Sequence, residues 1–296
     1  MVLSNEDGEP MESNRSILCQ YSADRADDSG IESLKIFCPT DGGYINYNVV
    51  HSLSEVSKCD TWRLSVAYYC DGALNRVRAL TRSGAEWEMA LKISGRPDFI
   101  GGYAHGDEVF DALDIKIDGK ICGLNDLQEL TAAKYITVEV ASRGYDPNDS
   151  TSEAHIHQKK ICFDISGVRV EQRVEWLNGY ELGRSYMAMM PPIKDVTDHY
   201  FTDKDPAKIP IKLAEDASGC GVDAICLCGE SGFIFEMRVE KYLSDVEKGN
   251  SFLVTDNGGV PYNKMYFPIH HKGFAKKGEA WETVTVYNIH RKNTEV

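Results

Sequence analysis

Long hydrophobic runs are absent from this sequence of 296 residues, in which no stretch approaches the roughly 18 apolar residues that a membrane-spanning helix needs. The first ten residues carry neither a basic segment nor an apolar core, so we expect no signal peptide and a cytoplasmic location. Internal repeats, heptads and glycine motifs for binding phosphate are also missing. These absences argue against a membrane protein, a coiled coil and a P-loop enzyme.

Basic residues are scarce as well. The chain has 32 Lys and Arg residues against 46 Asp and Glu residues, which gives a net charge of −14. Because a protein needs clusters of basic side chains to neutralise phosphates, nucleic acid is not expected as the main partner. An anionic sugar is not excluded, since a local group of Arg and His side chains can bind carboxylates within an acidic protein.

Outside one short stretch, closely spaced cysteines do not occur in the sequence. The nine cysteines are an odd number, and the densest set is Cys220, Cys226 and Cys228. A structural zinc site usually has two half-sites, each with about two to five residues between its ligands. We therefore predict reduced thiols, with no metal and no cofactor.

Helical patterns are nearly absent, because only 125–133 is a helical candidate. About a dozen short alternating segments joined by turns predict an all-β fold, a large antiparallel two-sheet β-sandwich of the supersandwich or jelly-roll type with little helix. Residues 1–34 are expected to be a flexible or extended arm that contains one short strand at 16–21, and 35–296 a single domain. The other expected strands are 44–50, 61–70, 76–81, 86–93, 109–117, 135–141, 154–164, 168–176, 181–190, 223–228, 233–242, 252–255, 263–269 and 281–289.

The stretch 96–108 is longer than a simple turn between its two flanking strands. Hairpin turns need about two to five residues, and the three glycines here allow backbone conformations and close approaches that other residues avoid. Tyr103, His105 and Glu108 add a phenol, an imidazole and a carboxylate. We interpret the stretch as part of a functional cleft; the alternative is a glycine-rich connection whose polar residues only face water.

Two histidines lie two residues apart on an expected strand. His155 and His157 therefore project from the same face of that strand. Three interpretations stay open: half of a metal site, two residues of a cleft, or polar positions on a solvated face. The sequence does not locate a third ligand, so no metal site is predicted.

The next strand, 168–176, has one apolar face and one charged face. Arg173 and Glu175 lie on the charged face, and Trp176 lies on the apolar face. The charged face is either a solvated sheet surface with weak ion pairs or the floor of a groove for a polar polymer. In the second case Arg173 is available to a carboxylate.

A third group follows on the expected strand that ends at Pro191. Arg184, Tyr186, Ala188 and Met190 are expected to share one face of it. An arginine and a tyrosine on the concave side of a sandwich suit a uronate, because the guanidinium can bind the carboxylate bidentately and the phenol can donate or accept a proton.

These side chains suit the removal of a proton next to a uronate carboxylate, which needs a base, a cation and an acid. The expected catalytic residues are His105 as base, Tyr186 or Tyr103 as acid, and Arg173 or Arg184 as cation. Glycoside hydrolysis is less favoured. Asp107 and Glu108 are neighbours on an extended chain and point to opposite sides, whereas a glycosidase needs two carboxyl groups that flank the sugar.

The stretches 98–108, 116–120 and 170–176 resemble β-rich proteins of phages and gut bacteria. Those proteins are loosely similar to the sandwich domains of polysaccharide lyases and sugar mutarotases. The resemblance implies a carbohydrate-related function and, for a phage-encoded chain, a virion or extracellular location. The arginine-serine-glutamate and glutamine-isoleucine-histidine signatures of jelly-roll alginate lyases are missing, so no catalytic residue is carried over.

The leading interpretation is a polysaccharide-active protein that cleaves uronate-containing polymer by β-elimination in a sheet groove. Two other functions stay open: a non-catalytic carbohydrate-binding or phage tail-type structural module, and a sugar epimerase or mutarotase-like enzyme. The expected partner is a carbohydrate polymer, without nucleic acid or membrane, and a homo-oligomer is left open. Substrate binding is expected to involve Arg173, His155, His157, Glu108, Glu175 and Trp176.

Overall fold

The computed structural model describes residues 16–24, 30–83, 87, 89–241, 251–256, 258–270 and 273–291. Nearly all regular structure in these ranges is β-strand, so the all-β prediction is confirmed. The helical elements there are single turns, namely α1 (Gly102–His105), η1 (Leu124–Leu127) and η2 (Lys194–Val196). None of them has the length and apolar character needed to cross a bilayer.

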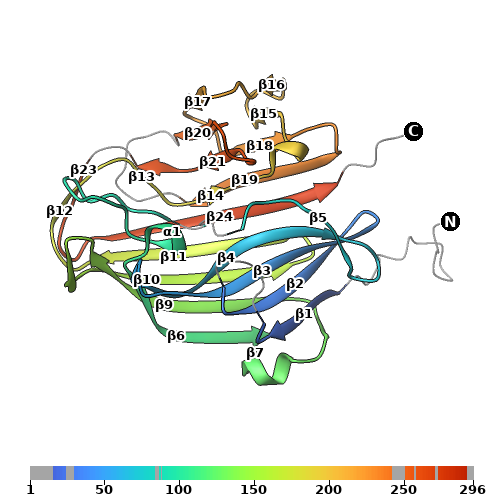
Figure 1. Cartoon of the computed structure of the whole chain (residues 1–296), viewed down its shortest axis with the longest axis horizontal. Helices are drawn as coiled ribbons and strands as arrows, with labels where there is room; N and C mark the ends of the chain where they lie inside the picture. The colour runs from blue at the N-terminus through green and yellow to red at the C-terminus, as the bar shows by residue number, and fades with distance from the viewer. Residues whose placement is uncertain are drawn as a thin grey trace.

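Sixteen strands form one main sheet, whose order is β16-β15-β18-β19-β24-β11-β10-β9-β6-β4-β3-β2-β1-β8, with β5 beside β4 and β7 beside β6. The long strands β9, β10, β11 and β24 cross the body of the molecule in Figure 1. The strands are β1 Ile17–Ser22, β2 Glu32–Thr40, β3 Gly43–Ser54, β4 Cys59–Cys70, β5 Arg76–Ala79, β6 Glu108–Ile117, β7 Lys120–Cys122, β8 Thr131–Ala133, β9 Ile136–Asp146, β10 Asp149–Asp164, β11 Gly167–Trp176, β15 His199–Thr202, β16 Ile209–Pro210, β18 Ala224–Cys228, β19 Phe233–Lys241 and β24 Ala280–Arg291.

Three smaller sheets are built from short strands that are interleaved in sequence with the last strands of the main sheet. Their orders are β12-β23, β13-β22 and β14-β21-β20-β17. The strands are β12 Tyr180–Leu182, β13 Ser185–Tyr186, β14 Met189–Met190, β17 Asp216–Gly219, β20 Phe252–Thr255, β21 Lys264–Tyr266, β22 Ile269–His270 and β23 Gly273–Ala275.

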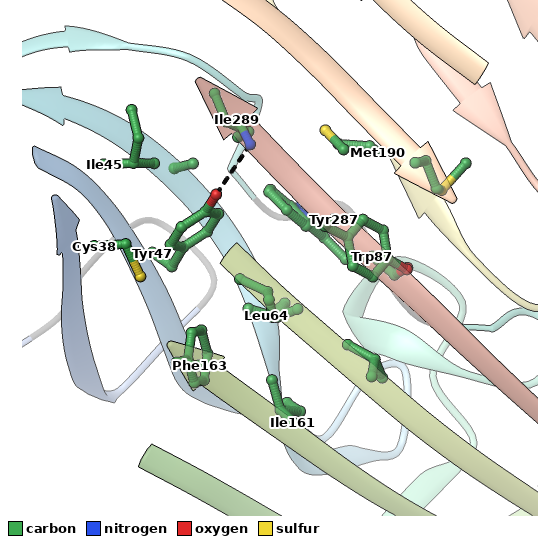
Figure 2. Close-up of a cluster of buried hydrophobic side chains, with 14 of the residues drawn as sticks. Cys38, Ile45, Tyr47, Leu64, Trp87, Ile161, Phe163, Met190, Tyr287 and Ile289 are labelled. Carbon is green, nitrogen blue, oxygen red and sulfur yellow. Dashed lines mark hydrogen bonds between the residues drawn. The ribbon is translucent and has the colours of Figure 1, made fainter. Parts of the chain in front are cut away.

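The hydrophobic core lies between parts of the main sheet that are not neighbours in its strand order (Figure 2). Tyr47 on β3 packs against Phe163 on β10 with ring centroids 6.2 Å apart, and its hydroxyl accepts a hydrogen bond of 3.3 Å from the Ile289 amide on β24. Trp87 is fully buried and contacts both Tyr47 and Tyr287. Burying each such ring contributes about 1.5–3 kcal/mol, which stabilises the packing of β3 against β10 and β24.

Strand β11 confirms the alternation that the sequence predicted. Val168, Val170 and Val174 are buried, and the charged residues between them are half-buried on the other face. The same period of two places His155 and His157 on the inner face of β10, where both are buried. The interpretation of these two histidines as positions on a solvated face is therefore wrong.

Two expected elements form differently. The helix expected at 125–133 is limited to the single turn η1, and the strand β8 follows it and pairs with β1. Two helical turns have little intrinsic stability, and the edge of the sheet offers the backbone hydrogen bonds instead. The strand expected at 181–190 is broken into β12, β13 and β14, which join three different sheets.

The sequence also predicted a hairpin between 76–81 and 86–93. Residues 84–86 and 88 lie outside the described residues. Strand β5 pairs with β4, whereas Ala90 and Ile93 form bridges with Tyr186 and Leu182. The described part of 86–93 therefore joins the segments around β12 and β13. The short strand expected near 16–21 is present as β1, which pairs with β2.

Candidate functional site

The loop that precedes β6 is packed closely against its surroundings. Arg96 holds its first part through two hydrogen bonds, of 2.7 Å and 2.8 Å, to the Asp146 carboxylate at the end of β9. Gly101 and Gly106 have φ angles of 119° and 78°. A Cβ atom at Gly106 would lie 1.6 Å from the Ser57 carbonyl oxygen, so the loop approaches Ser57 more closely than any side chain would allow.

His105 ends the single turn α1 and is oriented by a carboxylate. Its Nδ1 lies 2.8 Å from Asp98 Oδ1, and 24% of its side chain is exposed. Because an ionised carboxylate can only accept, Nδ1 carries the proton and the neutral ring keeps its lone pair on Nε2. The Phe99 ring packs on the imidazole with centroids 4.8 Å apart. His105 therefore has the arrangement of an oriented general base.

Tyr186 lies on β13 and meets the same phenylalanine. Its ring centroid is 6.3 Å from that of Phe99 and 4.7 Å from that of Tyr266 on β21. Lys92 extends its ammonium to 5.0 Å from the Phe99 ring centroid. Lys92, Phe99, His105, Tyr186 and Tyr266 are partly exposed, and Asp98 is exposed. We call these six residues the surface patch.

Arg184 is close to this patch in sequence but is not on a shared strand face with Tyr186, Ala188 and Met190. Ala188 and Met190 are fully buried, whereas Arg184 is exposed. The prediction of one shared face is wrong, because the chain leaves β13 and enters β14 within this segment. The Gly183 amide donates a 2.7 Å hydrogen bond to the Lys92 carbonyl, which places the backbone before Arg184 beside Lys92.

A buried polar network lies at the start of β6, three residues after His105. Glu108 Oε1 accepts a 2.6 Å hydrogen bond from the Ser142 hydroxyl and lies 2.9 Å from His157 Nδ1. His157 Nε2 lies 3.2 Å from Gln172 Oε1, and Gln172 Nε2 donates to the Met187 carbonyl at 2.7 Å. We call Glu108, Ser142, His157 and Gln172 the buried network.

The hydrogen-bond roles in this network define the charge on His157. Gln172 uses its NH₂ group for the Met187 carbonyl, so its oxygen faces His157 and can only accept. The Glu108 carboxylate also only accepts. Both nitrogens of His157 must therefore donate, which makes the ring a cation paired with the Glu108 anion.

Burial alone would raise the pKa of the Glu108 carboxyl. The hydrogen bond and charge of His157, the charge of Lys159 and the Ser142 hydroxyl outweigh burial and hold this pKa well below its ordinary value. The network also joins two parts of the chain: Glu108 follows the loop of His105, and the Met187 carbonyl follows Tyr186. Its geometry suits the positioning of these two side chains.

His155 and Trp176 form a separate buried pair beside the network. Their ring centroids are 5.5 Å apart, and both side chains are fully buried. The described residues contain no group of three or more metal-ligating side chains. Burial, followed by the charge of His157, lowers the pKa of His155 from 6.5 to about 3.

This shift implies an acid-sensitive fold. The unfolded chain takes up a proton at His155 near pH 6.5 and the folded chain only near pH 3, so the contribution to stability is complete above pH 6.5 and is lost as the pH falls toward 3. Between pH 7 and pH 5 we expect a loss of about 2 kcal/mol from this group. Urea unfolding of wild type and His155→Leu at both values measures it: the variant should lose less stability, and equal losses would contradict the assignment.

Arg173 and Glu175 lie on the other side of the sheet from the buried network. Both alternate on β11 with Gln172, which faces inward. Arg173 forms ion pairs of 2.8 Å with Glu175 and 3.7 Å with Glu282. The expectation that Arg173 is the cation beside His105 therefore conflicts with the alternation of β11. Among the positively charged residues described near the patch, Lys92 is better placed, since it contacts Phe99.

Tyr103 lies within the loop, in α1, and is half-buried. The Arg63 guanidinium lies 5.6 Å from its ring centroid, and the Ser57 hydroxyl donates to its carbonyl at 3.3 Å. Of the two expected acids, Tyr186 is the one whose ring contacts Phe99, the same ring that packs on His105. The sequence reasoning missed Lys92, Phe99 and Tyr266. Gln172 could have been noticed, since it is the polar exception on the apolar face of β11.

No protein-family model matches the sequence, and no curated protein sequence matches it. A galactose mutarotase-like protein from Clostridium acetobutylicum is similar in structure, with 8% identity, a TM-score of 0.51 and coverage of 94% of this chain and 100% of that chain. Heparan sulfate lyase from Pedobacter heparinus has 9% identity and a TM-score of 0.49, over 97% of this chain. A GH36 α-galactosidase from Geobacillus stearothermophilus has 12% identity and a TM-score of 0.44, over 92% of this chain.

The chain spans only 38% of the lyase and 41% of the galactosidase, so it corresponds to part of each. At identities of 8–12% these likenesses concern architecture and carry no residue roles. The chain therefore has an all-β fold similar to that of the galactose mutarotase-like protein.

Proposed function

We propose that this protein acts on carbohydrate at the surface patch and cleaves uronate-containing polysaccharide by β-elimination. The observation that carries the proposal is the chain of contacts from Asp98 through His105 and Phe99 to Tyr186. It joins an oriented base to a phenol across an aromatic ring on which a sugar can stack. We propose with it a two-sheet arrangement of the supersandwich or jelly-roll type in a single domain, 35–296, to whose main sheet the arm 1–34 adds β1 and the start of β2.

The elimination needs three groups around the uronate. His105 Nε2 removes the proton on the carbon next to the carboxylate, and that electron pair forms a carbon–carbon double bond as the bond to the glycosidic oxygen breaks. The Tyr186 hydroxyl donates its proton to the departing oxygen. Lys92 neutralises the carboxylate as negative charge develops there, and Arg184, which follows the Gly183 backbone beside Lys92, is the second candidate for this role. The step is therefore balanced in protons and electrons, and it needs no oxidant, reductant or other reactant.

The direct test is incubation with uronate polymers. Elimination creates an unsaturated uronate, and we expect the short-wavelength ultraviolet absorbance of its conjugated double bond to rise with time for polyuronates and not for neutral glucans. Hydrolysis releases reducing ends without this absorbance, and a binding module gives neither signal. A hydrolytic or silent outcome with every uronate polymer would overturn the proposal.

A second candidate is sugar epimerisation or mutarotation, which the similarity to a galactose mutarotase-like protein favours. His105 with a carboxylate partner would then move a proton without breaking a glycosidic bond. Exchange between the α- and β-anomer signals of free hexoses and hexuronates in NMR spectra separates this activity from elimination. The carbohydrate-binding or phage tail-type module is the outcome if sugars bind and neither reaction occurs.

A further inference from the structure

A groove of about 450 Å³ crosses the main sheet along outward-facing residues such as Gln158 and Arg173. Its lining also includes Gln172 of the buried network. It is lined by residues of β6, β9, β10, β11, β24 and β19, and its volume lies in the range of ordinary ligand sites. The surface patch contributes no residue to its lining.

The groove follows a row of directly paired residues across five strands. Ala112 on β6 pairs with Ala141 on β9, Ala141 with Gln158 on β10, Gln158 with Arg173 on β11, and Arg173 with Glu282 on β24. The short side chains of the two alanines form the floor of the groove, and the longer side chains of the other lining residues form its walls. Neighbouring strands are about 4.8 Å apart, so the row runs across the strands in steps comparable to the length of one sugar ring.

The walls of the groove are charged but internally paired. Arg173 pairs with Glu282 at 3.7 Å, Lys241 also pairs with Glu282, and Lys160 lies 3.8 Å from Glu171. Because the charged side chains of the walls form ion pairs with one another, they offer both acceptor oxygens and donor N–H groups without a strong positive or negative electrostatic potential. A ligand with hydroxyl groups, which donate and accept, matches such walls. A polyanion would lie against the carboxylates of Glu171 and Glu282.

We propose that this groove binds a neutral oligosaccharide segment that lies across the strands. The inference rests on the proposed carbohydrate function and adds a second site, which holds neutral sugars of the polymer away from the surface patch. The alanine floor contacts the apolar face of a sugar ring, the Gln158 amide bonds to its hydroxyls, and Arg173 with its carboxylate partners bonds to the hydroxyls along the wall.

Calorimetry and saturation-transfer NMR with β-1,4-linked hexaoses of glucose and mannose test the inference, with a hexamer of uronate as the charged comparison. We expect a neutral hexaose to bind with a Kd that excess uronate hexamer does not change. Ala112→Gln and Ala141→Gln should each raise Kd for the hexaose about tenfold. Ala132→Gln is the matched control, because Ala132 is also an exposed strand alanine but lies on β8, outside the groove.

The groove and the proposed function can fail separately. His105→Ala should strongly slow elimination while hexaose binding stays unchanged, and Ala112→Gln should weaken hexaose binding while short uronates are still cleaved. If no uronate is cleaved but a hexaose binds and Ala112→Gln weakens that binding, the groove stands without the lyase. Failure of both hexaoses to bind at millimolar concentration, or equal Kd values for Ala112→Gln and Ala132→Gln, would overturn the groove assignment.

Discussion

His105→Ala is expected to lower the rate of uronate elimination by about 10²- to 10⁴-fold, the usual contribution of a positioned general base. The ring is oriented by Asp98 at 2.8 Å and packs on Phe99, so its free nitrogen is available to a sugar on the patch. Asp98→Asn should cause a smaller loss, because the imidazole remains but its orientation and charge stabilisation weaken. Initial rates with a soluble polyuronate measure both effects.

A second partly exposed histidine provides the matched control. His199, the first residue of β15, has its Nδ1 2.6 Å from Asp198 Oδ1. This pair is of the same chemical type and is remote in sequence from the loop. His199→Ala should keep the wild-type rate. If His105→Ala keeps it as well, with the fold intact by circular dichroism, His105 is not the base.

Glu108→Ala is expected to lower the free energy of unfolding by about 3–5 kcal/mol, because it leaves the buried His157 cation without its partner. Glu108 and His157 are both almost fully inaccessible, and the Ser142 hydroxyl would also lose its acceptor. Urea unfolding at pH 7 measures the change. Glu153→Ala is the control: it removes a partly exposed carboxylate from Arg143 and should cost at most about 1 kcal/mol.

The same pair has a defined pH dependence. The folded-state pKa of Glu108 lies below its ordinary value of 4.5, so its contribution is present above pH 4.5 and is lost as the pH falls further. Glu108→Ala should therefore approach wild-type stability in strong acid. A penalty no larger than that of Glu153→Ala at pH 7 would show that the buried pair contributes little to the fold.

The sequence predicted the strands well because their physical signal is local. A strand with one buried face alternates with a period of two, and 168–176 shows this pattern and forms β11 with the expected inner and outer faces. The loop at 96–108 was also recognised, since glycines at Gly101 and Gly106 are required by positive φ angles and close backbone contacts. Both kinds of feature depend on neighbours in the chain.

The composition of the site was harder to predict because it depends on contacts between distant segments. The sequence predicted that Arg173 and His105 share one site. Neighbouring residues of a strand point to opposite faces, however, so Arg173 lies on the outer face of the sheet while Gln172, the residue before it, points inward. Lys92 and Tyr266 join the patch only because the loop, β13 and β21 meet in space. The alternation of apolar and polar residues along a strand predicts which residues share a face of that strand. It does not predict which strands will face each other in the fold.

The break of 181–190 into three strands has a similar cause. Met187, Ala188, Met189 and Met190 are all buried, so this run carries no alternation that would predict where one short strand ends and the next begins. The backbone partners, such as the bridge between Ala90 and Tyr186, lie about a hundred residues away. Such pairings are set by tertiary contacts that local patterns do not encode.

The central claim is that His105 and Tyr186 act on one bound sugar, and NMR titration of protein with labelled histidine and tyrosine rings tests it most directly. On addition of a short oligouronide, the ring signals of His105 and Tyr186 should shift together with one common Kd, while His199 stays unchanged. No shift of either ring at saturating oligouronide, or a titration of Tyr186 that leaves His105 unperturbed, would contradict the account.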